Sequence, residues 1–173
     1  MTEHYTWGIV LYKESIGENN SEYSVFTWDV GKVKARATGS RKILSRLAGH
    51  LEPGTLTTVR IIRKNAEGRF RVVEALQEYK TRLPAVIKTL SLTDDLTPLE
   101  EPDIKLFSLL KNLVLRGMDS GTNAALLKLL GFDPKTAKCG ACGSEEIAYF
   151  HSEDIMFLCA SCLSKRVNGR RSK

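Results

Sequence analysis

The chain lacks the features that would direct it to or across a membrane. None of its apolar stretches approaches the roughly 18 unbroken residues that suggest a membrane-spanning helix. The first residues, Met1–Tyr5, include an acid, Glu3, and contain no apolar core, so they do not match a secretory signal peptide. We therefore expect a cytoplasmic protein whose thiols stay reduced.

Signatures of catalysis are missing as well. Gly31-Lys32 is not a phosphate-binding loop, because Phe26 stands where the first glycine would be and Val33 follows the lysine. The histidines show no metal or catalytic-triad spacing; they are His4, His50 and His151. The isolated pair Asp94-Asp95 is better explained by solvent exposure near a helix end than by catalysis. We therefore expect a protein that is not an enzyme.

Positive charge is unevenly distributed along the 173 residues, whose net charge is +6. Residues 1–82 hold 14 Lys and Arg against 9 Asp and Glu, whereas residues 83–138 hold 7 of each and residues 139–173 hold 5 against 4. A clustered excess of positive charge favours a polyanionic partner such as nucleic acid. A soluble surface that happens to be basic is the alternative.

Residues 1–80 show the pattern of five short strands joined mostly by tight turns. Aromatic and β-branched residues alternate with polar ones, and Asp29–Lys32 is typical of a hairpin turn. This pattern predicts a small antiparallel barrel. The predicted strands are Tyr5–Tyr12, Glu22–Trp28, Lys32–Thr38, Thr55–Arg63 and Arg69–Gln77.

The segment from Gly31 to Arg46 contains six basic residues and no acidic one. Alternate residues of a strand point to the same face, so the first three cations would line one face and the others would follow in a loop. Such a patch can track a phosphate backbone, although an ordinary solvated face is the alternative. The candidate binding residues are Lys32, Lys34, Arg36, Arg41, Lys42 and Arg46. Nearby aromatics could stack on bases, but a place in the barrel core is the better explanation for most of them; they are Tyr5, Trp7, Tyr23, Phe26 and Trp28.

From Leu83 to Lys138 the pattern becomes helical. Asp103–Gly117 carries its apolar residues on one stripe, and Thr122–Leu130 predicts a second helix that ends at Gly131. Upstream, Thr97–Glu100 resembles a capping box, although Pro102 limits any helix there to about one turn. We predict a small helical module.

All four cysteines form two equally spaced pairs, Cys139/Cys142 and Cys159/Cys162, separated by 16 residues. A two-residue gap lets a tight turn aim both thiolates at one ion, and apolar runs between the pairs predict a returning hairpin. We predict one structural zinc ion, because four thiolates leave no open position for a reacting water. An iron–sulfur cluster is the main alternative, while disulfides are disfavoured in the cytoplasm.

The order of these motifs resembles the bacterial RecO family of DNA repair and recombination mediators over nearly the whole chain. Each matching piece alone is only moderately specific to the family, but their order and spacing together are strong evidence for the resemblance. The matching pieces are Trp7–Leu11, Phe26–Lys32, Ala37–Lys42, Leu51–Gly54, Leu127–Pro134, Cys139–Cys142 and Phe157–Cys162.

The resemblance implies an N-terminal OB-fold, a helical middle and a zinc-binding element. It also implies binding to single- and double-stranded DNA at the nucleoid, annealing of complementary strands, and work with RecR to load RecA onto DNA coated by single-stranded DNA-binding protein. The family's basic strand and loop correspond here to Lys32, Lys34, Arg36, Arg41 and Lys42. The helical middle is shorter than is usual in the family, where it helps to recognise the acidic tail of the single-stranded DNA-binding protein.

We therefore predict an α+β chain of three modules. Residues 1–80 form an OB-fold antiparallel β-barrel that binds nucleic acid, residues 81–138 form a small helical domain, and residues 139–173 form the four-cysteine zinc ribbon with a basic tail. We expect that tail, Lys165–Lys173, to be frayed. The first rival is an OB-fold and zinc-ribbon accessory protein of translation or transcription, and the second is a nuclease, which the lack of clustered carboxylates disfavours.

Overall fold

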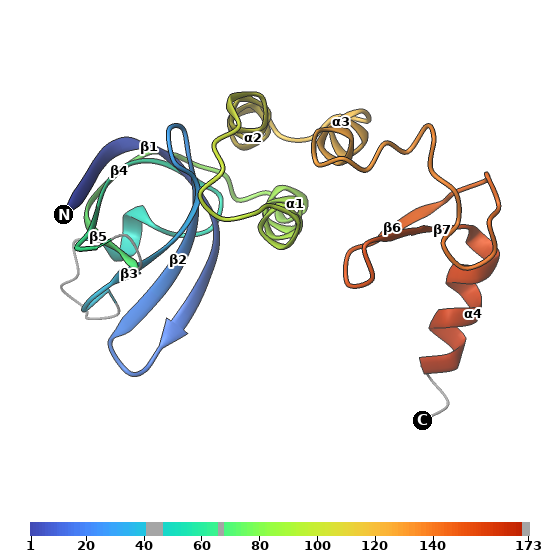
Figure 1. Cartoon of the computed structure of the whole chain (residues 1–173), viewed down its shortest axis with the longest axis horizontal. Coiled ribbons are helices and arrows are strands. Elements are labelled where there is room, and N and C mark those ends of the chain that lie inside the picture. Colours follow the sequence, from blue (N-terminus) through green and yellow to red (C-terminus); the bar gives the residue numbers. More distant parts are fainter. Residues whose placement is uncertain (41–46, 66–67, 171–173) are drawn as a thin grey trace. The chain divides into compact units, whose positions relative to one another are not determined.

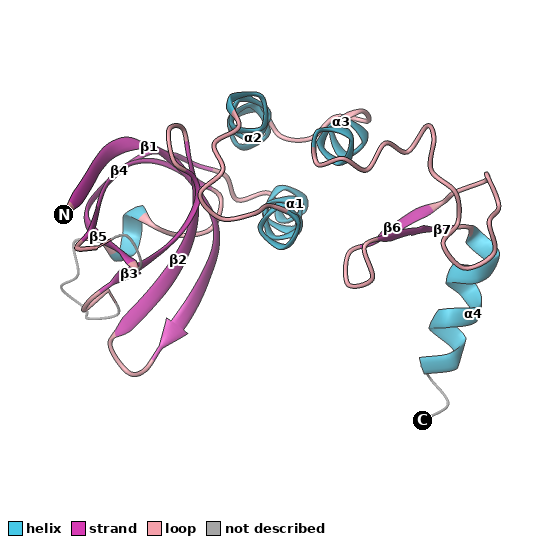
Figure 2. Cartoon of the chain, in the orientation of Figure 1, coloured by secondary structure: helices cyan, strands magenta, loops and turns pink. Residues whose placement is uncertain are grey.

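The computed structural model describes residues 1–40, 47–65 and 68–170 (Figure 1). The chain divides into two compact units, Met1–Thr122 and Asn123–Lys173, and each is treated by itself. The first unit combines strands with helices, and the second combines helices with a short hairpin (Figure 2). No helix in the described ranges is long and apolar enough to cross a membrane.

Five strands of the first unit close into a barrel in the order β1-β2-β3-β5-β4. The neighbouring pairs are antiparallel except for β3 and β5, which run parallel and pair Ala35 with Phe70 and Arg36 with Arg71. The predicted five-stranded, OB-like barrel is confirmed, and the parallel closing pair is the one departure from an antiparallel arrangement. The strands are β1 (Thr2–Ile16), β2 (Asn20–Thr27), β3 (Gly31–Ala37), β4 (Thr55–Arg63) and β5 (Phe70–Lys80).

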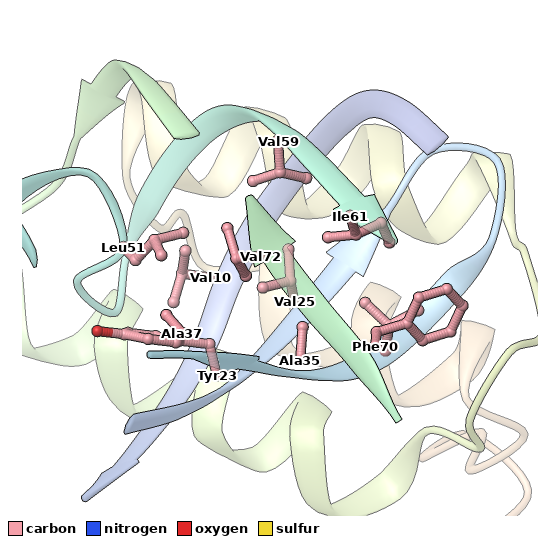
Figure 3. Close-up of a cluster of buried hydrophobic side chains, with 11 residues drawn as sticks. Val10, Tyr23, Val25, Ala35, Ala37, Leu51, Val59, Ile61, Phe70 and Val72 are labelled. Carbon is pink, nitrogen blue, oxygen red and sulfur yellow. The ribbon is translucent and has the colours of Figure 1, made fainter. Parts of the chain in front are cut away.

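Apolar residues alternate with polar ones along the strands, and the apolar side chains fill the barrel interior. On β3, Val33, Ala35 and Ala37 are fully buried, whereas Lys34 and Arg36 between them are exposed. The inward-facing side chains from all five strands meet in one cluster (Figure 3). Its buried members are Val10, Tyr23, Val25, Val33, Ala35, Ala37, Leu51, Val59, Ile61, Phe70 and Val72. Removing this much apolar surface from water is the main stabilising contribution in a domain of this size.

Two helices complete the first unit, α1 (Pro84–Leu96) against β1 and α2 (Ile104–Arg116) against the barrel. Asp103 caps α2 by accepting hydrogen bonds from the backbone N–H groups of Lys105 and Leu106 at 2.8 and 2.9 Å. The capping box expected at Thr97 is wrong. Thr97 instead ends α1, where its hydroxyl donates to the carbonyl of Thr93 at 2.7 Å.

The second unit contains helix α3 (Thr122–Leu129), strands β6 (Tyr149–His151) and β7 (Met156–Leu158), and helix α4 (Ala160–Arg170). The hairpin expected between the cysteine pairs is confirmed by the antiparallel pairing of β6 with β7. The expectation of a frayed tail over Lys165–Lys173 is wrong as far as Arg170, because α4 continues to that residue, and residues 171–173 lie outside the described residues. This helix starts at the second cysteine pair, where the N–H of Leu163 donates to the carbonyl of Cys159 at 3.0 Å.

Candidate nucleic-acid interface and metal centre

Lys32 does not lie on the exposed face where the alternation of β3 places it. Its side chain is 8% exposed, and its Nζ donates to the carbonyl of Asp94 on α1 at 2.5 Å. Its pKa is lowered by burial, which the charge of Asp94, 3.7 Å away, opposes in part. Asp94 also accepts a hydrogen bond from the hydroxyl of Ser24. Two expectations are thus corrected, because α1 covers Lys32 and Asp94 is held in this contact rather than free in solvent.

Lys34 and Arg36 remain exposed, and the barrel brings two further cations beside them. Arg71 is the register partner of Arg36 across the β3–β5 seam. Arg69 shares the carboxylate of Glu22 with Arg36, at 3.2 and 3.3 Å. We call Lys34, Arg36, Arg69 and Arg71 the basic surface. The sequence analysis missed Arg71 of β5 and Arg69, the residue directly before β5, because pairing between β3 and β5 joins residues 35 apart in the chain.

The basic surface holds an excess of positive charge. Among the described residues, Glu22 is the one acid that makes ion pairs with this surface, and it pairs with Arg36 and Arg69. Arg71 donates instead to the hydroxyl of Thr38 at 3.3 Å. An exposed surface with more cations than acids attracts phosphate groups, whose negative charge replaces the missing carboxylates.

The loop cations of the prediction, Arg41, Lys42 and Arg46, lie outside the described residues. They follow β3 directly in the chain, after Thr38–Ser40, and precede the short helix η1 (Ala48–His50). Their assignment to nucleic-acid binding stays a prediction.

The five candidate stacking aromatics separate into three sets, and the expectation that most of them fill the core is wrong, because only two are buried. Tyr23 and Phe26 are buried, so they belong to the interior of the unit. Trp28 packs edge-on against Phe107 of α2 with ring centroids 5.3 Å apart, and Lys111 of α2 lies 5.3 Å from the centre of the Trp7 ring. These two tryptophans therefore contact α2, which leaves Tyr5, 69% exposed, as the most accessible ring of the five.

The four cysteines meet at one point of the second unit. Their sulfur atoms all lie within 4.8 Å of one another, and the Sγ atoms of Cys142 and Cys159 are 3.7 Å apart. Four sulfur ligands at about 2.3 Å from a zinc ion in a tetrahedron are separated by about 3.8 Å. The donor set and its spacing therefore fit a single tetrahedral ion.

Backbone groups around the first cysteine pair prepare it to bind a cation. The N–H of Gly143 donates to the carbonyl of Cys139 at 2.8 Å and closes the turn, in which Gly143 has a φ of 74°. The pKa of Cys139 is lowered to about 6, chiefly because the N–H of Cys159 donates to its sulfur. The pKa of Cys162 is raised to about 12 because its thiol is hydrogen-bonded to the sulfur atoms of Cys142 and Cys159. All four sulfurs can ionise together only when a cation supplies the compensating charge.

Comparisons with known proteins agree with this architecture. The family description "Recombination protein O N terminal" matches residues 1–79, and "Recombination protein O C terminal" matches residues 81–172. The chain is 29% identical to "DNA repair protein RecO" of Bacillus pumilus over 174 residues, which cover 91% of this chain and 68% of that protein. It is 26% identical to the protein of the same name from Halalkalibacterium halodurans, with 94% and 70% covered.

The two family matches together cover nearly the whole chain, and the C-terminal one alone covers more than half of it. They confirm the resemblance seen in the motifs, and the alternative of a translation or transcription accessory protein is not favoured. The chain therefore belongs to the RecO family of DNA repair and recombination proteins.

Proposed function

We propose that this recombination mediator binds single- and double-stranded DNA through the basic surface of its barrel and anneals complementary strands. The observation that carries the proposal is the pairing of Arg36 with Arg71, which places cations from two strands on one exposed face. Arg41, Lys42 and Arg46, which follow β3 in the sequence, are proposed to contribute to the same binding. Contacts to phosphates are independent of base sequence, so binding tolerates any sequence and weakens with salt.

Annealing follows from charge neutralisation. Two complementary strands repel each other through their phosphates, and a surface with excess cations lowers this repulsion while bases pair. The bases themselves supply the specificity, so the protein needs no catalytic group. We propose that the chain is not an enzyme and hydrolyses no nucleotide, and a DNA-stimulated ATPase activity that a point mutation in this chain abolishes would overturn this.

The metal is proposed to be one structural zinc ion per chain, held by Cys139, Cys142, Cys159 and Cys162. Zinc supplies tetrahedral cross-linking of the two cysteine turns, which stabilises a unit too small to fold on its apolar core alone. Sulfur atoms gathered this tightly favour a single ion over a cluster that places several iron atoms between its cysteines.

The protein partner is proposed to be RecR, with which the chain would assist RecA loading, and the single-stranded DNA-binding protein is a further proposed partner. The protein would act in the cytoplasm, at the nucleoid. The test is annealing of complementary oligonucleotides coated with single-stranded DNA-binding protein, with and without RecR. We expect the chain to speed annealing, and RecR to increase RecA loading on the coated strand. No acceleration on either bare or coated strands would refute the function, while tighter binding to RNA than to matched DNA would favour the rival accessory role.

A further inference from the structure

A second cationic site lies at the end of β4, on the Phe70 side of the sheet rather than on the outward side that carries Arg71, and a carboxylate covers it. Arg63 ends β4, directly after Ile62, the register partner of Arg71. Its Nη1 donates to both oxygens of Glu100 at 2.8 Å, and its guanidinium lies 4.3 Å from the centre of the Phe70 ring. The aromatic ring below and the carboxylate beside it therefore fix the guanidinium in one place.

The contact uses only part of the guanidinium. Both Glu100 oxygens meet the same nitrogen, so the two parallel hydrogen bonds of a fork-like arginine–carboxylate pair are not formed. The Nε of Arg63 is buried and has no hydrogen-bond partner within the described part of the chain. A phosphate group offers more acceptor oxygens than a carboxylate and can accept from Nη1 and Nη2 together, in the fork geometry that Glu100 does not form.

Glu100 is held in a conformation that costs energy. Its φ of 60° lies in the left-handed region, which non-glycine residues rarely adopt. The segment carrying it is attached to β3 by a bridge between Leu99 and Lys32 and by a hydrogen bond of 2.8 Å from the N–H of Glu100 to the carbonyl of Lys32. Pro98, Leu99, Glu100 and Glu101 are all exposed. Because the Glu100 side chain is exposed, a competing ligand can displace its carboxylate from Arg63 while the backbone contacts with β3 remain.

We infer that Arg63 is a binding site for a backbone phosphate of nucleic acid, and that Glu100 occupies this site and keeps it closed. The inference rests on the proposed DNA binding and adds a regulatory contact to it. Glu100 takes the place of a phosphate, so Arg63 contributes to DNA binding only when Glu100 is neutralised or displaced. Phe70 holds the guanidinium ready, which reduces the entropy lost when a phosphate binds.

The test is a double-mutant cycle on binding to a single-stranded oligo(dT) probe, with Glu100→Gln and Arg63→Met. Methionine keeps an apolar stem over Phe70 while removing the cation. Glu101→Gln is the matched control, since Glu101 is the adjacent exposed acid and makes no ion pair within the described ranges. We expect Glu100→Gln to tighten binding about fivefold at about 0.1 M salt and to steepen the log–log salt slope by about 0.7, the effect of one added phosphate contact.

Glu101→Gln should change affinity less than twofold and leave the slope as it is. Arg63→Met alone should have little effect, but it should erase the gain of Glu100→Gln when the two are combined. A gain that persists without Arg63, or equals that of Glu101→Gln, would overturn the inference while leaving DNA binding intact. Absence of binding by the unmodified chain would refute the proposed function instead. If Arg63→Met fails to fold, the salt slopes of the two glutamate variants still decide between these results.

Discussion

Arg36 of β3 and Arg71 of β5 are neighbours across the parallel seam that closes the barrel. Both side chains are exposed, and like charges at directly opposed positions of a sheet lower stability. Glu22 offsets this in part through its contact with Arg36. We propose that one anion binds both guanidinium groups.

Replacing both arginines with glutamine should therefore separate binding from stability. Arg36→Gln with Arg71→Gln should weaken binding to single-stranded oligonucleotides about tenfold, because two phosphate contacts are lost. The free energy of unfolding should change by no more than about 0.5 kcal/mol, since exposed charges contribute little to it. Fluorescence anisotropy and urea unfolding measure the two quantities. Unchanged affinity would remove these residues from the interface.

The buried contact between Lys32 and Asp94 should matter for stability rather than for DNA binding. Lys32→Met leaves the Asp94 carboxylate without its cation and should lower the free energy of unfolding by about 2 kcal/mol near neutral pH. Affinity for DNA should stay within twofold, because the amine is covered by α1. A large loss of affinity in a variant that remains folded would return Lys32 to the interface.

The same lysine predicts a pH dependence. Burial lowers its folded-state pKa below the ordinary value of 10.5, so the unfolded chain binds more protons between these two values. Stability therefore rises with pH through this window. Urea unfolding at a series of alkaline pH values should show the unmodified protein gaining stability relative to Lys32→Met up to about pH 10.5. A difference that stays constant, or shrinks, would contradict the burial of the charged amine.

Zinc should be present at one ion per chain in protein purified without added metal. Cys159→Ser removes one of four thiolates and should unfold the second unit, because binding free energy is folding free energy in such small modules. The barrel should keep its own unfolding transition. Elemental analysis and thermal unfolding followed by circular dichroism measure these outcomes. Less than half an equivalent of zinc, or the visible absorbance of an iron–sulfur cluster, would refute the assignment.

A feature could be predicted from the sequence when the residues that form it are close together in the chain. The zinc site could be predicted because each pair of ligands lies within one turn and the hairpin between them is short. The strands of the barrel could be predicted from alternation alone, as at Lys32–Thr38. The pairing of Arg36 with Arg71 could not be predicted, because the periodicity within β3 contains no information about its register with β5.

The sequence also could not predict which strand residues a helix covers. The alternation that exposes Lys34 and Arg36 also places Lys32 on the outer face, and only the packing of α1 shows that this position is buried. The ends of β1 exceeded the predicted Tyr5–Tyr12 for a related reason. Its first half pairs with β4 and its second half with β2, so partners on both sides extend it in both directions.

The most direct test of the central claim, that DNA binds electrostatically on the barrel, is the salt dependence of binding to a single-stranded oligonucleotide. If about four to six cations reach phosphates, the log–log slope should be roughly −3 to −4. Arg41→Glu with Lys42→Glu should weaken binding to all sequences alike, flatten that slope and slow annealing in parallel. Reversal of Lys105 and Lys111 on α2 is the matched control and should leave the slope unchanged. Loss of binding in the α2 variant, with unmodified affinity and slope in the Arg41/Lys42 variant, would contradict the account and place the DNA on the helices.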